Sequence, residues 1–341
     1  MTRPQPSRRA VTVGGLGLLG LAACSSGTGD AGGPAPSATR LGGAEPSDAP
    51  EPAEAPAGEV APAGYAAEGV VVDPVSGLVV VGVRRPDRLL VLAPDTLAVQ
   101  RTVRVPGSVR HLAVVPAGGT VLVPNEGDDS LLEADVLTGA TRSTPVGHVP
   151  HDGAGTVGGE LVVADEFGGS LSIVRDGAVV FTVDDLTQPG GVVALGSNAV
   201  AVDVADFSVS TYDLSARRRT GRLPAGAGPT HVTVAGEDRV AVADTRGGRL
   251  LLFSVDPLRQ VATLEVGTSP YGLAGDPDAG LVWVTLTASN ELVGVDTAGD
   301  RLRVIERYPT VRQPNSVAAT AGSGLLFVAS RTDGTVQRIA R

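Results

Sequence analysis

A sequence repeat of about forty residues occurs seven times along this chain, and this repeat constrains the fold more than any single residue does. Each copy reads as two short apolar strands, a polar turn, a third strand that usually leads to Asp, and a fourth strand. Residues 68–83, EGVVVDPVSGLVVVGV, match residues 271–286, YGLAGDPDAGLVWVTL, and residues 315–330, NSVAATAGSGLLFVAS. Four short strands in a repeat of this length are typical of one blade of a β-propeller.

The residue that opens each first strand sets the register of the repeat. The openings are spaced by 39 to 44 residues and lie at Glu68, His111, His151, Gly190, Thr230, Tyr271 and Asn315. The sequence therefore predicts an all-β domain over residues 58–341, a seven-bladed β-propeller with four-stranded antiparallel blades. The last copy contains only three strands, and an unpaired blade edge is an open template for strand pairing. We therefore expect an N-terminal strand near residues 58–63 (GEVAPA) to complete the last blade and close the ring.

The first residues differ in composition from the repeats. Arg3, Arg8 and Arg9 precede a short apolar stretch, residues 11–23, and a helix needs about 20 apolar residues to cross a bilayer. A positive segment followed by a short apolar one is typical of a signal peptide, here residues 1–23. Leu21-Ala22-Ala23-Cys24 resembles the lipobox of bacterial lipoproteins, which implies a lipid on Cys24.

The segment around Cys24 also indicates where the protein resides. Ser7-Arg8-Arg9 with Val11 resembles the twin-arginine export motif without its bulky aromatic residue, so twin-arginine and general secretory export both stay open. Residues 24–57 are rich in Gly, Ala, Pro, Ser and acidic residues, a composition that predicts a disordered tether. Cys24 is the only cysteine, so we expect no disulfide and no thiol ligand in the propeller. These features predict an exported lipoprotein on the extracytoplasmic side of the cell membrane.

Charge and motifs exclude several classes of function. The chain has 27 basic and 37 acidic residues, without the basic stripe that nucleic-acid binding requires, so we expect no nucleic-acid partner. The sequence contains no serine-hydrolase elbow, phosphate-binding loop or metalloprotease helix motif. We expect a monomer.

All four histidines fall where one predicted blade leads into the next: His111, His148, His151 and His231. In a propeller these crossings share a face with the turns that follow the second strands. Those turns carry acids or amides in blades two to five, namely Asn125-Glu126, Asp165-Glu166, Asp203 and Asp244. Blades one and seven carry Arg84-Arg85 and Arg331 instead, and blade six carries Thr287. The sequence thus predicts a channel mouth with histidines and carboxylates on one side and arginines on the other.

Neutral imidazole and carboxylate groups are competent ligands for zinc or copper. The candidate metal ligands are His111, His148, His151, His231, Asp165 and Asp244. The candidate residues for binding an organic ligand are Glu68, Arg84, Asn125, Glu126, Tyr271, Asn315 and Arg331. We expect such a metal site to lose affinity as the imidazoles protonate below about pH 6.

A purely structural interpretation of the same residues stays open. Asp and Asn at strand ends are ordinary turn residues, because their side chains accept hydrogen bonds from nearby backbone amides. A histidine at a strand start can bond a neighbouring carbonyl inside a narrow channel. Trp283 lies in the middle of a predicted strand, where we expect it to pack between blades, whereas Tyr271 opens a blade and is expected to line the channel mouth.

Four short motifs at the blade openings resemble the YVTN-type propeller repeat: Pro150-His151, Pro229-Thr230-His231, Pro270-Tyr271-Gly272 and Pro314-Asn315. The resemblance extends over nearly all of residues 58–341, although the literal tetrapeptide is absent. It implies the propeller fold; relatives of this kind include surface-layer repeats, substrate-binding and metal-handling periplasmic propellers, and sugar lactonases. Tryptophan docking repeats of the quinoprotein dehydrogenase kind are not visible, which disfavours a quinone cofactor.

We therefore expect a lipid-anchored propeller that binds a divalent metal or a small ligand at its channel mouth, and we favour a binding protein over an enzyme. Two alternatives stay open. One is a lactonase-like or lyase-type enzyme, in which a metal or a His/Glu pair activates water or moves a proton. The other is a scaffold for a protein partner at the cell envelope. The enzyme alternative depends on fold analogy, because no catalytic motif supports it.

Overall fold

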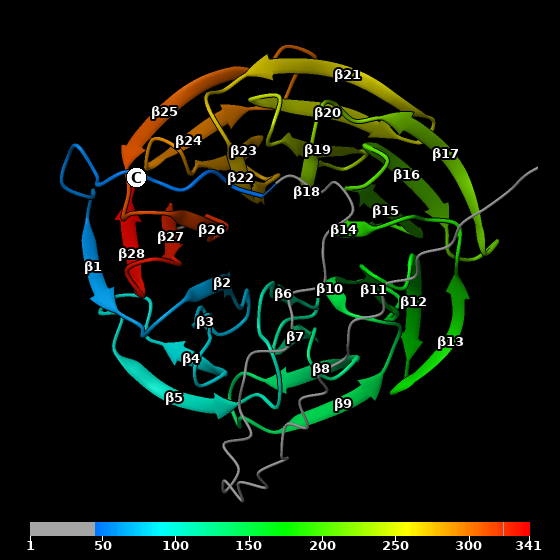
Figure 1. Cartoon of the computed structure of the whole chain (residues 1–341), viewed down its shortest axis with the longest axis horizontal. Coiled ribbons are helices and arrows are strands. Elements are labelled where there is room, and N and C mark those ends of the chain that lie inside the picture. The colour runs from blue at the N-terminus through cyan, green and yellow to red at the C-terminus, as the bar shows by residue number, and fades with distance from the viewer. Residues whose placement is uncertain (1–44, 323) are drawn as a thin grey trace, which may run out of the picture. The chain divides into compact units, whose positions relative to one another are not determined.

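The computed structural model describes residues 45–322 and 324–341. The predicted signal peptide, Cys24 and residues 24–44 of the predicted tether lie outside the described residues. The described part consists of strands and turns without a helix, and it therefore contains no helix long and apolar enough to span a membrane. Its 28 strands form seven four-stranded antiparallel sheets around a central axis (Figure 1). The predicted seven-bladed β-propeller is confirmed.

In blades one to six the strands follow chain order from the innermost to the outermost. Blades one to three comprise β2 (Ala67–Val72), β3 (Val79–Val83), β4 (Arg88–Leu92), β5 (Val99–Arg104); β6 (Ala113–Val114), β7 (Thr120–Asn125), β8 (Ser130–Asp135), β9 (Thr141–Pro145); β10 (Pro150–Gly155), β11 (Leu161–Asp165), β12 (Ser170–Arg175) and β13 (Ala178–Val183). Blades four to six comprise β14 (Pro189–Leu195), β15 (Asn198–Asp203), β16 (Ser208–Asp213), β17 (Arg218–Pro224); β18 (Pro229–Gly236), β19 (Arg239–Asp244), β20 (Arg249–Val255), β21 (Leu258–Glu265); β22 (Pro270–Asp276), β23 (Leu281–Leu286), β24 (Glu291–Asp296) and β25 (Arg303–Pro309).

The seventh blade contains strands from both ends of the described chain. Its three inner strands are β26 (Pro314–Ala319), β27 (Leu325–Ser330) and β28 (Thr335–Ala340), and its outer strand is β1 (Glu59–Pro62). β1 pairs antiparallel with β28 from Glu59 opposite Arg338 to Pro62 opposite Thr335 (Figure 1). The predicted closure by an N-terminal strand is therefore confirmed, and it leaves β28 without an open edge.

The core lies between neighbouring blades, because the middle strands bury both of their faces. Val80 and Leu89 of blade one pack in one cluster with Val121 and Val123 of blade two. Trp283 of blade six is fully buried in a cluster that continues into blade seven, as the sequence predicted. Burying one such large apolar side chain contributes about 1.5–3 kcal/mol to stability. Because these side chains lie between blades, the ring is stabilised mainly by contacts between neighbouring blades.

The innermost strands share an irregularity near their first residues. In six blades the pairing of the first and second strands shifts there, as between Pro150 and Asp152 in blade three and between Pro314 and Ser316 in blade seven. In blade two the innermost strand β6 is reduced to two residues. A bulge redirects the side chains next to it. This irregularity lies where the sequence placed the opening residues, at the mouth of the channel.

Candidate metal centre at the channel mouth

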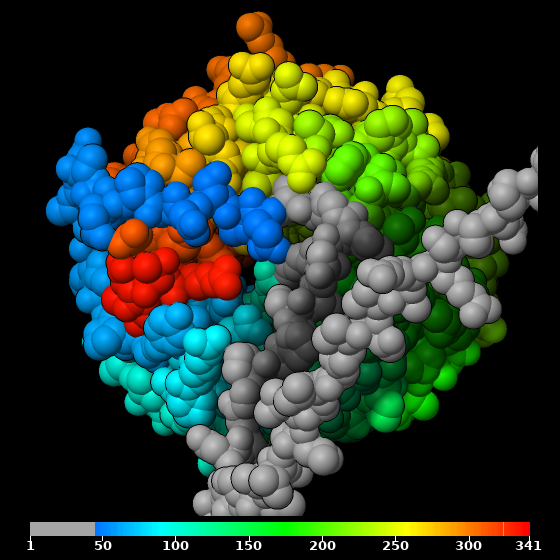
Figure 2. Space-filling model, in the orientation of Figure 1, coloured from blue at the N-terminus to red at the C-terminus, as the bar shows by residue number. Residues whose placement is uncertain are grey.

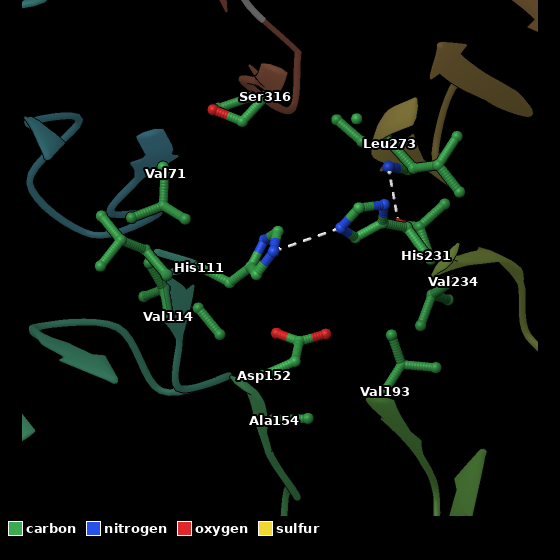
Figure 3. Close-up of a pocket in the computed structure, with 18 of the residues that line it drawn as sticks. Val71, His111, Val114, Asp152, Ala154, Val193, His231, Val234, Leu273 and Ser316 are labelled. Carbon is green, nitrogen blue, oxygen red and sulfur yellow. Dashed lines mark hydrogen bonds between the residues drawn. The ribbon is translucent and has the colours of Figure 1, made fainter. Parts of the chain in front are cut away.

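Three histidines from blades two, three and five meet at the channel mouth. His111, His151 and His231 each offer a ring nitrogen, and these atoms lie within 4.8 Å of one another. The Nε2 atoms of His111 and His231 are 3.3 Å apart (Figure 3). The ring centroids of His111 and His151 are 4.6 Å apart, and those of His111 and His231 are 4.7 Å apart. The structure thus brings together three of the four histidines that the sequence singled out.

Two glutamates hold the third imidazole from the other side. The Nδ1 atom of His151 lies 2.9 Å from Glu126 Oε1 and 3.2 Å from Glu166 Oε2. Gln188 in turn donates from Nε2 to Glu166 Oε1 over 2.9 Å. Because Nδ1 faces the carboxylates, the Nε2 atom of His151 is the nitrogen left for a metal. Carboxylates that orient the distal nitrogen of a ligating histidine are a recurrent feature of protein metal sites.

The electrostatics separate the three histidines into two neutral rings and one cation. Burial, together with the His151 charge, lowers the pKa of His231 to about 3 and that of His111 well below its usual range. Burial also disfavours the charged form of His151, but the Glu166 charge and the hydrogen bonds with Glu126 and Glu166 outweigh it and raise its pKa to about 9. Despite burial, the pKa of Glu166 falls to about 2 because His151 stabilises its charged form.

The arginines are interleaved with the carboxylates, so the predicted two-sided mouth is wrong. Arg84 lies 3.5 Å from Glu68 and 3.8 Å from Glu126. Arg331 lies 3.2 Å from Glu68, and Arg110 lies 3.6 Å from Glu126. Opposite charges lower one another's energy in a partly desolvated site, and segregating them would leave buried charges unpaired. One network of ion pairs therefore continues from Arg331 to the Glu126 that contacts His151.

Three of the candidate metal ligands point elsewhere. His148 is exposed and its Nδ1 lies 3.2 Å from Asp129. Asp165 accepts hydrogen bonds from Ser170, Ser172 and the backbone of Gly147. Asp244 accepts from the backbone amides of residues 227, 228 and 247. Both aspartates therefore act as the ordinary turn residues that the structural interpretation described.

The other candidate residues lie around the histidines. Tyr271 is buried and meets His231 edge-on, with ring centroids 4.4 Å apart, and burial raises its pKa to about 12. Asn315 donates from Nδ2 to Glu68 over 3.4 Å. Asn125 is fully buried, and among the described residues neither atom of its amide group has a hydrogen-bond partner.

The two glutamates that contact His151 each follow the end of a second strand by one residue. The sequence selected Asp165, the last residue of β11, whereas Glu166 reaches His151. Glu126 has the same place after β7, and Arg84 and Arg331 have it after β3 and β27. Alignment of the repeats at this position could have found Glu166. Arg110 was missed because it has no counterpart of its own type before the other blade openings. Gln188 was missed although Gln313 has the same place in blade seven, one residue before the proline that precedes the opening.

The last residues of the predicted tether are seated on the propeller, which differs from the expectation of disorder for residues 45–57. Gln313 accepts from the amide of Ala49 over 2.7 Å and donates to the carbonyl of Ser47 over 3.0 Å. Asn290 donates to the carbonyl of Pro50 over 3.0 Å. We call residues 45–57 the arm; Figure 2 shows it in dark blue across blades six and seven, ending near the channel. Its first described residue, Glu45, lies 3.5 Å from Arg110.

Comparison with protein-family models gives no match, and comparison with curated proteins gives none either. Among solved structures, this chain is similar to U3-55K, with a TM-score of 0.73, 14% identity, and coverage of 84% of this chain and 100% of that one. It is also similar to hydrazine synthase of Kuenenia stuttgartiensis, with a TM-score of 0.71 and 16% identity, over 81% of this chain and 96% of that one. Virginiamycin B lyase from Staphylococcus aureus matches with a TM-score of 0.70 and 12% identity, over 82% of this chain and 97% of that one. At these identities the similarities show the propeller fold alone.

Proposed function

We propose that this protein is an exported, lipid-anchored propeller of the YVTN type that binds a divalent transition metal through His111, His151 and His231. The observation that supports this most strongly is the 3.3 Å separation of the two Nε2 atoms. In a tetrahedral zinc site with Zn–N distances of about 2.0–2.1 Å, two ligand nitrogens lie about 3.3–3.4 Å apart. These two ligand nitrogens therefore already have the spacing that a bound ion requires, and a ring nitrogen of His151 lies within 4.8 Å of both.

The chemistry of the donors supports the same proposal. Burial lowers the pKa of His111 and of His231, so both rings are neutral at about pH 7 and each can offer an unprotonated nitrogen to a cation. Glu126 and Glu166 add two negative charges that offset the charge of a bound cation. Imidazole ligands suit zinc and copper, and oxygen-preferring ions such as Mg²⁺ are disfavoured by three nitrogens.

A tetrahedral ion with three protein ligands keeps one position for water or substrate, as in catalytic zinc sites. This open position favours, as a second candidate, an enzyme of the hydrolase or lyase class, in which the metal would polarise a carbonyl or activate water. We place the binding function first, because the described residues near the histidines form no nucleophile–base pair. Turnover of simple lactones and esters by the zinc-loaded protein distinguishes the two.

Zinc and copper titration of the metal-free protein, followed by calorimetry and thermal melting, tests the site. At free metal one hundredfold above the dissociation constant, the folded state gains about 2.7 kcal/mol. This gain raises Tm by about 4–5 °C in a domain of this size. His151→Ala should remove most of this shift, whereas His148→Ala, which deletes the exposed histidine of the same loop, should leave it unchanged. Equal shifts in both variants, or no stoichiometric binding by the unmodified protein, would refute the proposal.

A further inference from the structure

The central channel contains a cavity of about 440 Å³ that begins at His111 and His231. The innermost strands of six blades and the β6 region of blade two contribute to its wall, in which polar and apolar surface are about equally exposed. Val71, Val114, Val193 and Val234 surround it (Figure 3). A volume of this size lies in the range of pockets that hold small organic molecules. The metal-site proposal uses only the two histidines at the end of this cavity.

The polar groups of the cavity are mostly hydrogen-bond acceptors. The Asp152 carboxylate points into the channel (Figure 3) and accepts from the backbone amides of Gly153 and Val192, each over 2.9 Å. Asn315 uses its Nδ2 for Glu68, and its Oδ1 is buried without a partner among the described residues. The hydroxyl oxygen of Ser316 is also buried and has no partner in the described part of the chain.

The charged side chains that line the cavity are also of one sign, which is negative. No lysine or arginine is among the described residues that line it. His151 precedes Asp152 in the chain, but its Nδ1 is paired with Glu126 and Glu166. Among the described residues that line the cavity, Asp152 is therefore the one acidic side chain, and the valine side chains supply the apolar part of the wall. A carboxylate in such surroundings is best stabilised by a cation that brings its own N–H donors.

We propose that the channel binds a small molecule with an apolar body and a protonated amino group, which donates to Asp152. The valine side chains would cover the apolar body, and burial of that surface would drive binding. Asn315 Oδ1 and the Ser316 hydroxyl offer further acceptors for N–H or O–H groups of the ligand. A carboxylic acid of the same shape is disfavoured, because its charge would face Asp152. The inference does not depend on the metal site.

Three probes of nearly the same shape test the charge preference: 2-phenylethylamine, 2-phenylethanol and 3-phenylpropanoate. Each is titrated calorimetrically into the full chain, freed of metal by a chelator, at about pH 8, where an ordinary carboxyl group is ionised. The amine should bind one per chain and about 10- to 100-fold more tightly than the alcohol, as expected for a hydrogen bond to a charged group. The acid should not bind. Asp152→Asn should reduce amine affinity to about that of the alcohol.

A pair of valine variants tests the place of binding. Val193→Phe fills the channel and should abolish binding of the amine, whereas Val180→Phe, on the exposed outer strand β13, should leave it unchanged. Equal affinities for amine and alcohol, undiminished binding to Asp152→Asn, or no heat from any probe would overturn the inference. Zinc titration of Val193→Phe keeps the two proposals distinguishable, because this variant retains all three histidines.

Discussion

Metal binding should displace one proton from His151, and this proton can be counted. In the metal-free protein the Nδ1 side of the imidazolium faces Glu126 and Glu166 at 2.9 and 3.2 Å. A metal must therefore replace the proton on Nε2. With a pKa of about 9 for His151, about 3 for His231 and a strongly lowered value for His111, only His151 carries an extra proton between about pH 5 and 8.

The magnitude follows from these pKa values. At about pH 8 a group with a pKa of about 9 is about 90% protonated, so each bound zinc should release about 0.9 proton. Three histidines with the ordinary pKa of 6.5 would together release about 0.1 proton at that pH. Zinc affinity should rise about tenfold, or about 1.4 kcal/mol, for each pH unit between about pH 5 and 8. The sequence-based expectation was a loss of affinity as the imidazoles protonate below about pH 6; the raised pKa of His151 predicts that the loss begins at higher pH.

Calorimetry in buffers with different ionisation enthalpies measures the proton release directly. Glu166→Gln should reduce the release at about pH 8, because it removes the charge that raises the pKa of His151 most strongly. His148→Ala should match the unmodified protein, since His148 is exposed and lies outside the three-histidine cluster. A release near 0.1 proton at about pH 8 would show that His151 is neutral before the metal binds, and would refute the electrostatic argument.

Four further predictions concern anchoring, the arm, ring closure and acid stability. If Cys24 is lipidated as proposed, Cys24→Ser should move the protein from the membrane to the soluble fraction with Tm unchanged; continued membrane retention would contradict lipidation. Gln313→Ala should weaken docking of the arm by about 1–3 kcal/mol and speed its proteolysis, whereas Gln260→Ala on the outer strand β21 should not. Removing residues 1–62 should lower Tm by about 6–7 °C relative to removing residues 1–57, since the loss of β1 costs about 4 kcal/mol; equal melting would disprove closure by β1. The pKa of His231 is about 3 folded and about 6.5 unfolded, so the unfolded state binds more protons between these values and stability falls with falling pH; His231→Gln should lessen that slope by about 1.4 kcal/mol per pH unit.

The closure of the ring shows how much of this fold is local information. Each repeat carries its own alternation of apolar strands and turn residues, and a blade cannot bury its faces without neighbours. Because the period is nearly constant, counting the openings from Glu68 to Asn315 was enough to predict seven blades. The missing fourth strand of the last repeat likewise predicted that β1 would pair with β28, which it does.

The residues of the channel mouth could be predicted only in part. The openings of the innermost strands must converge on the axis, so His111, His151 and His231 were found from their place in the repeat. Asp165 and Asp244 were wrong as members of the cluster, because their carboxylates accept hydrogen bonds from backbone amides of the loop that leads into the first strand of the same blade. The next residue faces the mouth, and this one-position difference depends on how the turn is built.

The sequence by itself determined the fold class, the number of blades, the closing strand and the position of the histidines near the axis, since all of these depend on periodicity. Only the tertiary structure decided which side chains meet. The 3.3 Å contact between His111 and His231 joins residues 120 positions apart, and Glu126 and Glu166 reach His151 from two different blades. Such contacts, and the pKa values that follow from them, depend on distances of a few ångströms across the channel. No repeat pattern contains those distances.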